Sequence, residues 1–230
     1  MKSLTSTFKE IYTERFYENQ GFPVLVDLVK SEHHRVRDVG CGSGANMRLL
    51  VERGHEVVGI TLSEREAKVV QEHGFICKVW DVTDESLLFE PGSFDAILFS
   101  HVLEHVAWPD VVLERYLKLL RTEGGIYVAL PNVLQFGNRW QFLRGRFRYT
   151  ESGLMDRTHL RFFDFVTGRR LLEDAGVEVV RHFGSGQFPM GPLREWFPSF
   201  SQWVDGQASH FFPGLFAFHI IIVGQLNNQQ

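Results

Sequence analysis

Residues 36–44 read Val36-Arg37-Asp38-Val39-Gly40-Cys41-Gly42-Ser43-Gly44, and this stretch decides the fold. A short apolar strand pattern leads here into three alternating glycines, and a helical pattern follows from Ala45 to Arg53. Glycine is required where a strand turns sharply into a helix, because a side chain would keep a ligand away from the backbone and disfavour positive φ. The stretch therefore predicts a loop that binds a nucleotide-type cofactor.

Two classes of cofactor compete for this loop. The spacing Gly40-x-Gly42-x-x-Ala45 fits the dinucleotide pattern, which expects an acidic residue about 20 residues further on to hold the ribose. That position falls in Gly59-Ile60-Thr61-Leu62-Ser63, which contains no carboxylate. The missing carboxylate disfavours a dehydrogenase.

The order of motifs between residues 35 and 185 resembles that of the class I S-adenosylmethionine-dependent methyltransferases. Asp38 before the first glycine and Gly44 after the second match the family's first motif, D-x-G-x-G-x-G. Three later segments resemble the family's third strand, its fourth strand with the following loop, and its fifth strand: 76–82, 91–105 and 119–132. The resemblance implies a Rossmann-like, doubly wound α/β fold with a seven-stranded sheet, mostly parallel with an antiparallel last strand, and helices on both faces.

The same resemblance implies S-adenosylmethionine as the cofactor and indicates the residues that hold it. In this family the Asp at the position of Asp81 accepts a hydrogen bond from the adenine amino group, and Leu62 is expected to pack on the adenine. Ser100 and His101 are expected to lie by the methionine amino group. The predicted cofactor residues are Asp38, Gly40, Gly42, Gly44, Thr61, Leu62, Asp81, Val82, Ser100 and His101.

Thr61 departs from the family pattern, in which Asp or Glu usually bonds both ribose hydroxyls. The surrounding Gly-Ile-Thr-Leu-Ser is similar to the version in cyclopropane fatty acid synthases. A hydroxyl offers one bond where a carboxylate offers two, so we expect cofactor binding to survive in weaker form. An inactive, degenerate cofactor site is the alternative.

The segment His101-Val102-Leu103-Glu104-His105 also matches H-x-x-E-H, the zinc signature of one class of peptidases. Both histidines would then share one helix face, with Glu104 as the base. The segment directly follows a predicted parallel strand, however, and Trp108-Pro109 arrives too soon for a long helix. We therefore predict no metal, and expect Glu104 or His105 to border the transferred methyl group.

His159 is the first candidate for a general base, and His105 is the second. An ordinary histidine pKa of about 6.5 leaves the imidazole largely neutral, so it can take a hydroxyl proton as oxygen attacks the sulfonium methyl. This in-line displacement depends strongly on holding the nucleophile and the methyl group close and aligned. A carboxylate or phosphonate acceptor would need no base, and His159 would then bind substrate or serve the structure.

Residues 131–163 are expected to carry the choice of substrate. Six arginines against Glu151 and Asp156 give this segment a charge of about +4 within a net acidic chain. Guanidinium groups pair well with carboxylate or phosphate, which favours an anionic acceptor, and a solvated basic face is the alternative. The segment is similar to small-molecule methyltransferases of surface-sugar and natural-product pathways and to the methionine-pathway protein MetW. The predicted substrate residues are Asn132, Arg139, Trp140, Arg157 and Arg161.

Composition is typical of an ordinary enzyme domain: 230 residues, 44% hydrophobic, with a net charge of -4. We expect one methyltransferase domain in four parts. These are an N-terminal helical cap (1–34), a cofactor-binding core (35–130), a substrate-side insertion (131–163), and a C-terminal part with a helix, two strands and an aromatic cap (164–230). The charge balance predicts no nucleic-acid partner, although the arginine-rich insertion leaves RNA methylation as an alternative.

The expected location is the cytoplasm. Two cysteines suggest buried thiols in a reducing compartment rather than a disulfide framework. No secretory signal pattern follows Met1, and the longest apolar run, from Leu215 to Val223, is shorter than the roughly 20 residues that cross a bilayer. A transmembrane segment is therefore not expected, and a homodimer is left open.

Two aromatic-rich segments have open roles. The stretch from Thr7 to Gln20 predicts a helix that either covers the cofactor mouth or anchors itself to the core. The stretch from Gln187 to Phe218 holds many Phe and Trp residues among prolines and glycines, and is expected to form a small cap packed over the pocket. An exposed cluster that contacts a lipid-linked substrate or a partner is the alternative.

Together these patterns predict methyl transfer from S-adenosylmethionine to a small-molecule acceptor, most simply at a hydroxyl or acidic oxygen of a sugar, lipid-linked compound or secondary metabolite. N- or C-methylation is the nearest alternative. A MetW-like protein that binds the cofactor but regulates an acyltransferase is the alternative from another class.

Overall fold

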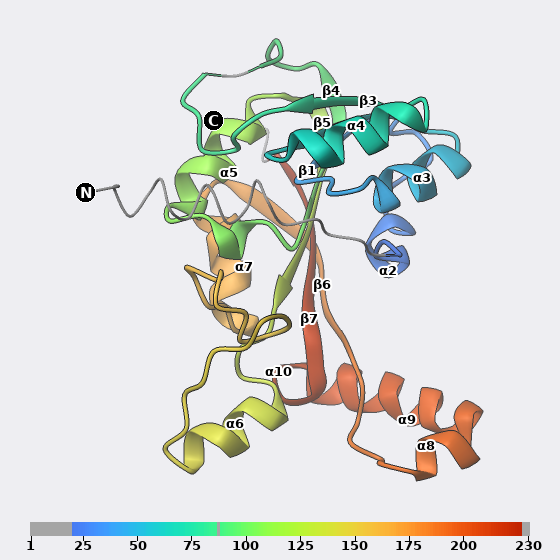
Figure 1. The fold of residues 1–230 in the computed structure, drawn as a ribbon, viewed down its shortest axis with the longest axis vertical. Coiled ribbons are helices and arrows are strands. Elements are labelled where there is room, and N and C mark those ends of the chain that lie inside the picture. The colour runs from blue at the N-terminus through green and yellow to red at the C-terminus, as the bar shows by residue number, and fades with distance from the viewer. Residues whose placement is uncertain (1–19, 87, 227–230) are drawn as a thin grey trace.

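The computed structural model describes residues 20–86 and 88–226. Their centre is a seven-stranded sheet in the order β3-β2-β1-β4-β5-β7-β6 (Figure 1). The first five strands are mutually parallel, and β7 runs antiparallel to both β5 and β6. This arrangement confirms the predicted fold class. The strands are β1 (Arg35–Val39), β2 (Glu56–Thr61), β3 (Ile76–Val79), β4 (Phe94–Ser100), β5 (Leu120–Pro131), β6 (Val177–Gly186) and β7 (Ala217–Leu226).

Helices cover both faces of the sheet, and each face has its own buried cluster. Alternate residues of β4 show the division: Ala96 and Leu98 belong to one cluster, and Ile97 and Phe99 to the other. The first cluster includes residues of α2 (Pro23–Val26), α3 (Ala45–Glu52) and α4 (Glu64–Glu72). The second includes residues of α5 (Pro109–Leu117) and α7 (Phe165–Asp174). Strands buried on both sides explain why their sequences are almost continuously apolar.

The structure corrects the sequence expectation at the beginning of β5. The spacing of Leu113, Leu117 and Leu120 predicts that they share one helix face, but α5 ends at Leu117 and Leu120 already pairs with Phe94 in the sheet. A register shift follows, so that Ala96 pairs with Gly125. Leu120 has the spacing of the apolar face of α5 although it belongs to β5. Its pairing in the sheet determines that the helix ends before it.

The last two strands are longer than their apolar patterns predict. The apolar patterns predict strands over 177–180 and 218–223, whereas β6 and β7 pair from Val177 with Leu226 to Gly186 with Ala217. The additional part forms a ribbon that extends past β1 to β4, with β5 alongside as far as the pair of Pro131 with His219 (Figure 1). Its residues are only partly buried, so the apolar signal that marks a core strand is weak there.

Four helices lie beyond the carboxyl end of β5, at the far end of this ribbon (Figure 1). They are α6 (Phe136–Leu143), α8 (Leu193–Trp196), α9 (Pro198–Phe211) and α10 (Pro213–Phe216). Arg139 Nη2 donates to the carbonyl of Gly214 at 3.1 Å, which ties α6 to α10. We call this assembly the helical layer. Many of its large apolar side chains are exposed.

Three further expectations concern the ends and the thiols. The predicted helix from Thr7 to Gln20 lies outside the described residues except for Gln20. Cys41 and Cys77 are buried and free, with their sulfur atoms 3.6 Å apart, as predicted. Within 20–86 and 88–226, no helix combines the length and the apolar character needed to span a bilayer.

Gly40→Ala and Gly54→Ala form a matched pair that tests the tight packing of the glycine loop. Both glycines have positive φ, 70° and 90°, so alanine is strained at each. A Cβ at Gly40 would also lie 2.6 Å from Val102, whereas one at Gly54 meets nothing within 4 Å. We expect Gly40→Ala to lower the free energy of unfolding by about 1–3 kcal/mol more than Gly54→Ala, measured by urea denaturation. Equal losses would contradict the close contact.

Candidate active site

The candidate site lies at the carboxyl edge of the parallel strands. The glycine loop follows β1, Thr61 and Leu62 end β2, Asp81 follows β3, and Ser100 ends β4. Strand β1 has β2 on one side and β4 on the other, so the chain reverses the direction in which it adds strands. Open α/β sheets bind ligands in the crevice at such a switch point.

The loop turns the chain from β1 into α3 through left-handed backbone conformations. Gly40, Gly42 and Gly44 have φ values of 70°, 53° and 86°. Gly44 is also the N-cap of α3, and its amide donates to the carbonyl of Cys41 at 3.0 Å. The N-terminus of a helix after such a turn is suited to an anionic group of a ligand. All three predicted loop glycines therefore occupy positions that suit a cofactor.

Asp38 lies fully buried beneath the loop. Neither of its carboxylate oxygens has a hydrogen-bond partner among the described residues. Burial raises the pKa of Asp38 to about 7, although the neighbouring charge of Arg37 opposes the rise. A buried carboxylate left without a donor is costly, and its presence at this edge fits a site that a ligand completes.

Thr61 is joined to a carboxylate that sequence analysis did not assign to the site. Its hydroxyl donates to Glu66 Oε2 at 2.5 Å and accepts from the backbone amide of Ser63 at 3.2 Å. Glu66 is buried in the first turn of α4. The acidic group missing from the end of β2 is thus present behind it, five residues later. The Ser63-x-x-Glu66 capping pattern was the available signal.

An open cavity of about 680 Å³ adjoins the ends of β2 and β3. Leu62, Trp80 and Asp81 line it. The Asp81 side chain is fixed, because its Oδ1 accepts from the amide of Thr83 at 2.9 Å and from the Thr83 hydroxyl at 2.7 Å. Val82 packs against the buried cluster on the α5 side. Apolar side chains and three carboxylates, those of Glu64, Asp81 and Asp84, share the lining, which suits a flat, amino-bearing heterocycle.

His101 begins the loop after β4 in a left-handed conformation, with φ of 57°. Its Nδ1 lies 3.3 Å from the buried Glu104 carboxylate. Its ring lies 5.7 Å from that of Phe22 and 4.9 Å from that of His219. Burial, followed by the charge of His101, lowers the pKa of His219 to about 4. Sequence analysis missed both neighbours; a polar residue inside the apolar run of β7 was the signal for His219.

The predicted bases meet at Glu104, in a group that we call the Glu–His–His trio: Glu104, His105 and His159. One ligand atom from each lies within 4.8 Å of the others. The loop carrying His159 is docked there, because the amides of Leu160 and Arg161 donate to the carbonyl of Glu104 at 2.8 and 3.0 Å. Such a group can relay protons or hold a metal ion.

The H-x-x-E-H segment does not form the helix that a zinc peptidase needs. Its regular part is a three-residue 3₁₀ helix, η1 (Leu103–His105). His101 lies outside the trio, while His159 comes from a distant part of the sequence. The peptidase alternative therefore loses the shared helix face on which it depended.

The ionisation of the trio favours proton acceptance. Burial lowers the pKa of His159, and no described residue bonds its Nδ1. Although burial raises the pKa of Glu104, the contact with His101 and the charges of His105 and His101 leave it below its usual value. A neutral imidazole beside an ionised carboxylate can accept a proton and be stabilised once charged.

The predicted substrate residues are spread over the insertion rather than gathered in one pocket. The Asn132 amide is buried and donates to the carbonyls of Gly214 and Ala217. Arg139 bonds backbone carbonyls, and Trp140 is half-exposed beneath the guanidinium of Arg144. Arg157 pairs with Glu151 at 3.2 Å.

Arg161 lies two residues after His159, and its backbone amide donates to the carbonyl of Glu104. Its Nε donates to the carbonyl of Ala107 at 2.8 Å, and its guanidinium lies over the ring of Trp108. The roles of these residues toward a substrate remain predictions.

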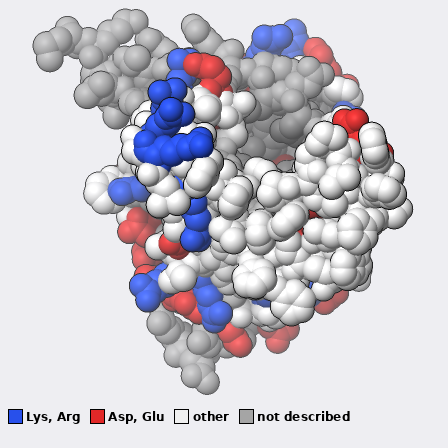
Figure 2. All heavy atoms as spheres, turned by 90° about the horizontal axis from the view of Figure 1, so that it is seen from below, with Lys and Arg blue, Asp and Glu red and all other residues white. Residues whose placement is uncertain are grey.

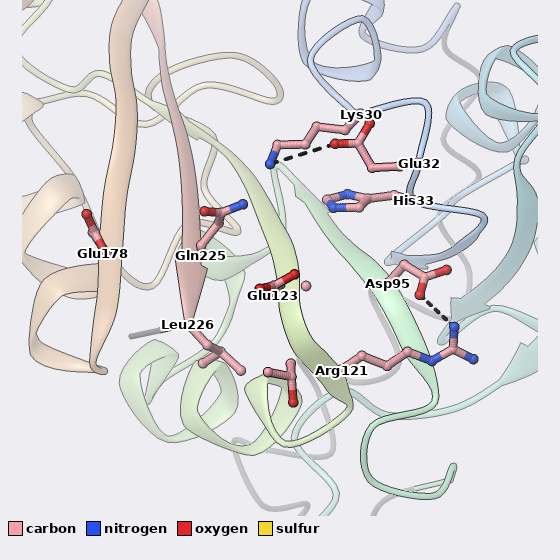
Figure 3. A pocket seen from close by; sticks show the side chains of 11 residues that line it. Lys30, Glu32, His33, Asp95, Arg121, Glu123, Glu178, Gln225 and Leu226 are labelled. Atoms are coloured by element: carbon pink, nitrogen blue, oxygen red, sulfur yellow. Dashed lines mark hydrogen bonds and ion pairs between the residues drawn. The ribbon is translucent and has the colours of Figure 1, made fainter. Parts of the chain in front are cut away.

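A second cavity, of about 540 Å³, lies at the opposite edge of the sheet (Figure 3). Its walls carry charged side chains such as Lys30, Glu32, Asp95 and Arg121, several of them paired with one another. It lies by the amino ends of β4 and β5, away from the switch point. We do not assign it to the cofactor.

A doubly wound sheet with a glycine loop and an orphan buried carboxylate at its switch point defines a cofactor-dependent α/β enzyme. The chain belongs to the methyltransferase domain family, whose model matches residues 14–182. The ubiquinone biosynthesis O-methyltransferase of Chromobacterium violaceum is 35% identical over 103 residues, or 43% of this chain and 44% of that protein. The chain therefore matches less than half the length of this curated relative.

Solved structures support the same fold. A S-adenosylmethionine-dependent methyltransferase from Archaeoglobus fulgidus superposes with a TM-score of 0.64 at 19% identity, covering 97% of this chain and 100% of the other. The 1,6-didemethyltoxoflavin-N1-methyltransferase of Burkholderia thailandensis, solved with S-adenosylhomocysteine, gives 0.57 at 16% identity, covering 89% and 77%. The chain is therefore a methyltransferase domain with the fold of these neighbours, and the dehydrogenase alternative is set aside.

Asp38→Asn should stabilise the cofactor-free protein at neutral pH. A carboxyl whose folded pKa is raised above its unfolded value contributes stability that is present below pH 3.8 and is lost as the pH rises toward 7. The amide removes this loss. We expect the variant's advantage in free energy of unfolding to grow by at most about 1.4 kcal/mol per pH unit across that window. Urea denaturation at several pH values measures it, and an advantage that does not change with pH would contradict the assignment.

Proposed function

We propose that the protein transfers a methyl group from S-adenosylmethionine to an oxygen atom of a small-molecule acceptor. The observation that carries the proposal is the buried Glu–His–His trio beside the end of β4, on the same edge of the sheet as the glycine loop. The curated relative from Chromobacterium violaceum acts as an O-methyltransferase, which supports oxygen as the acceptor atom. When bound, the cofactor supplies a methyl group on a sulfonium centre.

The cofactor residues are assigned by their place along the carboxyl edge. We assign the glycine loop, with Gly40, Gly42, Gly44 and the buried Asp38, to the cofactor because it ends β1 at the switch point. Leu62 and Asp81 are assigned to the adenine because they line the cavity beside β2 and β3, and Val82 because it follows Asp81 in the chain. We assign the ribose to Thr61 backed by Glu66, and the amino-acid end to Ser100 and His101.

His159 is the proposed general base. Because burial lowers its pKa, it is neutral at pH 7 and can accept a proton from an acceptor hydroxyl. The resulting imidazolium is stabilised by the Glu104 carboxylate within the trio. His105, whose Nδ1 lies within 3.3 Å of the Thr158 carbonyl and hydroxyl, holds the second position.

The acceptor is proposed to be anionic or to carry a hydroxyl or acidic oxygen, as in a sugar, lipid-linked compound or secondary metabolite. The arginine-rich insertion supports this charge, since its guanidinium groups outnumber its carboxylates. Arg161 and Arg157 belong to the loop that carries His159, and so are the arginines best placed to meet an acceptor. We assign substrate choice to residues 131–163 and cofactor binding to 35–130.

Asp81→Asn tests the cofactor site by calorimetric titration with S-adenosylhomocysteine. The amide oxygen can still accept the two bonds from Thr83, so the turn is retained, while the carboxylate is lost. We expect affinity to fall by about tenfold or more, corresponding to about 1.4 kcal/mol, as for a lost charge-assisted hydrogen bond.

Asp164→Asn is the matched control, because Asp164 Oδ1 accepts from the amide of Val166 and from the amide and hydroxyl of Thr167, outside the cavity beside β2 and β3. It should change affinity by less than about threefold. Equal losses in both variants would mean that turn structure, not adenine recognition, sets the affinity.

His159→Ala should lower kcat by about 10²-fold or more and leave affinity for S-adenosylhomocysteine unchanged, if His159 removes a proton. Because the pKa of His159 is lowered, activity of the wild type should fall only below pH 6.5, as the imidazole becomes protonated. Steady-state kinetics across pH measures both effects. His73→Ala, at the exposed end of α4, is the control.

Equal loss of binding and turnover, or loss of neither, would contradict the role of His159. A turnover that a chelator abolishes and a divalent cation restores would assign the trio to a metal instead. Saturable cofactor binding without product from any acceptor would favour the regulatory, MetW-like alternative.

A further inference from the structure

The helical layer presents an unusual surface at the substrate end of the sheet. Seen from below, uncharged residues cover most of this end of the molecule (Figure 2). Eight large apolar side chains in the four helices and at their junctions each expose more than half of their surface: Leu143, Leu193, Trp196, Phe197, Phe200, Trp203, Phe211 and Phe212. We call this surface the aromatic face. Apolar patches of this kind on soluble proteins usually mark an interaction site.

The layer is fixed by polar contacts that leave the aromatic side chains outside. Arg194 pairs with Asp205 at 2.6 Å, and the amide of Phe188 donates to the same carboxylate at 2.7 Å. These contacts join α8, α9 and the end of the ribbon. The charges of Arg194 and Asp205 neutralise each other. The same contacts anchor α8 and α9 to the ribbon, so the exposed apolar residues belong to an ordered part of the structure.

Basic residues adjoin the apolar surface. Arg144, Arg146 and Arg148 are exposed just after α6, and residues 131–150 contain no Asp or Glu. Among the described residues, no carboxylate forms an ion pair with any of the three. Lysine and arginine atoms gather along one side of the uncharged surface in Figure 2.

We propose that the aromatic face docks on the surface of a membrane that contains anionic lipids. Trp and Phe side chains partition into the boundary between headgroups and acyl chains, and adjoining arginines bind lipid phosphates. Each basic residue near an anionic bilayer adds about 1 kcal/mol of attraction. A second copy of the chain is a poorer occupant, because the face offers few free carboxylates to the arginines of its partner.

Docking in this orientation turns the carboxyl edge of the sheet toward the membrane. The helical layer lies beyond the end of β5, at the edge of the sheet where β4 also ends (Figure 1). Asn132, at the end of β5, is hydrogen-bonded to Gly214 and Ala217 at the base of the layer. Membrane docking by this face is independent of which acceptor atom is methylated, and vesicle binding can be measured without cofactor.

Co-sedimentation of the full chain with phospholipid vesicles tests the proposal. We expect binding to vesicles that mix phosphatidylglycerol with phosphatidylcholine, weaker binding at high salt, and little binding to phosphatidylcholine alone. Two variants should each lower the partition coefficient by about tenfold or more: Trp196→Ser with Phe197→Ser, and Arg144→Ser with Arg146→Ser and Arg148→Ser.

Matched controls replace exposed residues elsewhere. Val166→Ser with Val180→Ser removes two exposed apolar side chains, and Arg48→Ser with Lys68→Ser and Lys118→Ser removes three exposed cations. Both should bind vesicles as the wild type does. Circular dichroism confirms that each variant is folded.

Failure of the folded wild type to bind anionic vesicles would overturn the proposal, as would equal losses in the face and control variants. A wild-type dimer that Trp196→Ser with Phe197→Ser dissociates, without any vesicle binding, would assign the aromatic face to a second copy. Retained methyl transfer in a variant that no longer binds vesicles would separate docking from the proposed chemistry.

Discussion

The parallel pairing of β1 with both β2 and β4 is the constraint on which the candidate site depends. It fixes the direction of four strand ends at one edge and opens a crevice where the strand order reverses. Close packing leaves this arrangement little freedom. A Cβ at Gly59 in β2, for example, would lie 2.6 Å from the sulfur of Met47 and 2.8 Å from that of Cys41. The glycine loop is therefore held against a rigid sheet.

Buried carboxylates concentrate at this same edge. Asp38, Glu66 and Glu104 are each almost completely inaccessible to solvent. Their environments differ: Glu66 receives the Thr61 hydroxyl, Glu104 faces histidines, and Asp38 has no partner among the described residues. A buried carboxylate without a hydrogen-bond donor or a positive partner is found mainly where a ligand or a reaction uses the group. Their distribution agrees with a cofactor at the glycine loop and proton transfer near β4.

The long ribbon of β6 and β7 gives the molecule a second functional region. It carries the helical layer past the carboxyl edge, and the Asn132 amide, which donates to the carbonyls of Gly214 and Ala217, binds that layer to the end of β5. The proposed membrane surface and the proposed acceptor site therefore belong to one continuous part of the structure. This juxtaposition suits an acceptor that is met at a lipid surface.

Local patterns in the sequence determined the elements and their order. The glycine loop, the buried apolar strands and the Ser63 cap follow from backbone sterics, burial and hydrogen bonds between near neighbours, so they can be read without the fold. The resemblance to class I methyltransferases then indicated Asp81 and Ser100 as cofactor residues. The predicted ends of helices and strands were less accurate, as Leu120 shows, because sheet pairing can override the apolar spacing of a helix.

Only the tertiary structure decided which side chains meet. His159 joins Glu104 and His105 across more than 50 residues, and His219 reaches His101 from the last strand; no local pattern encodes either contact. Likewise, the helical layer is as rich in aromatic residues as a buried core segment. Its aromatic side chains are exposed because few other elements pack against them. The sequence determines local backbone geometry through interactions between near neighbours. Which distant side chains lie close together, and which remain exposed to solvent, depends on how distant segments pack against one another.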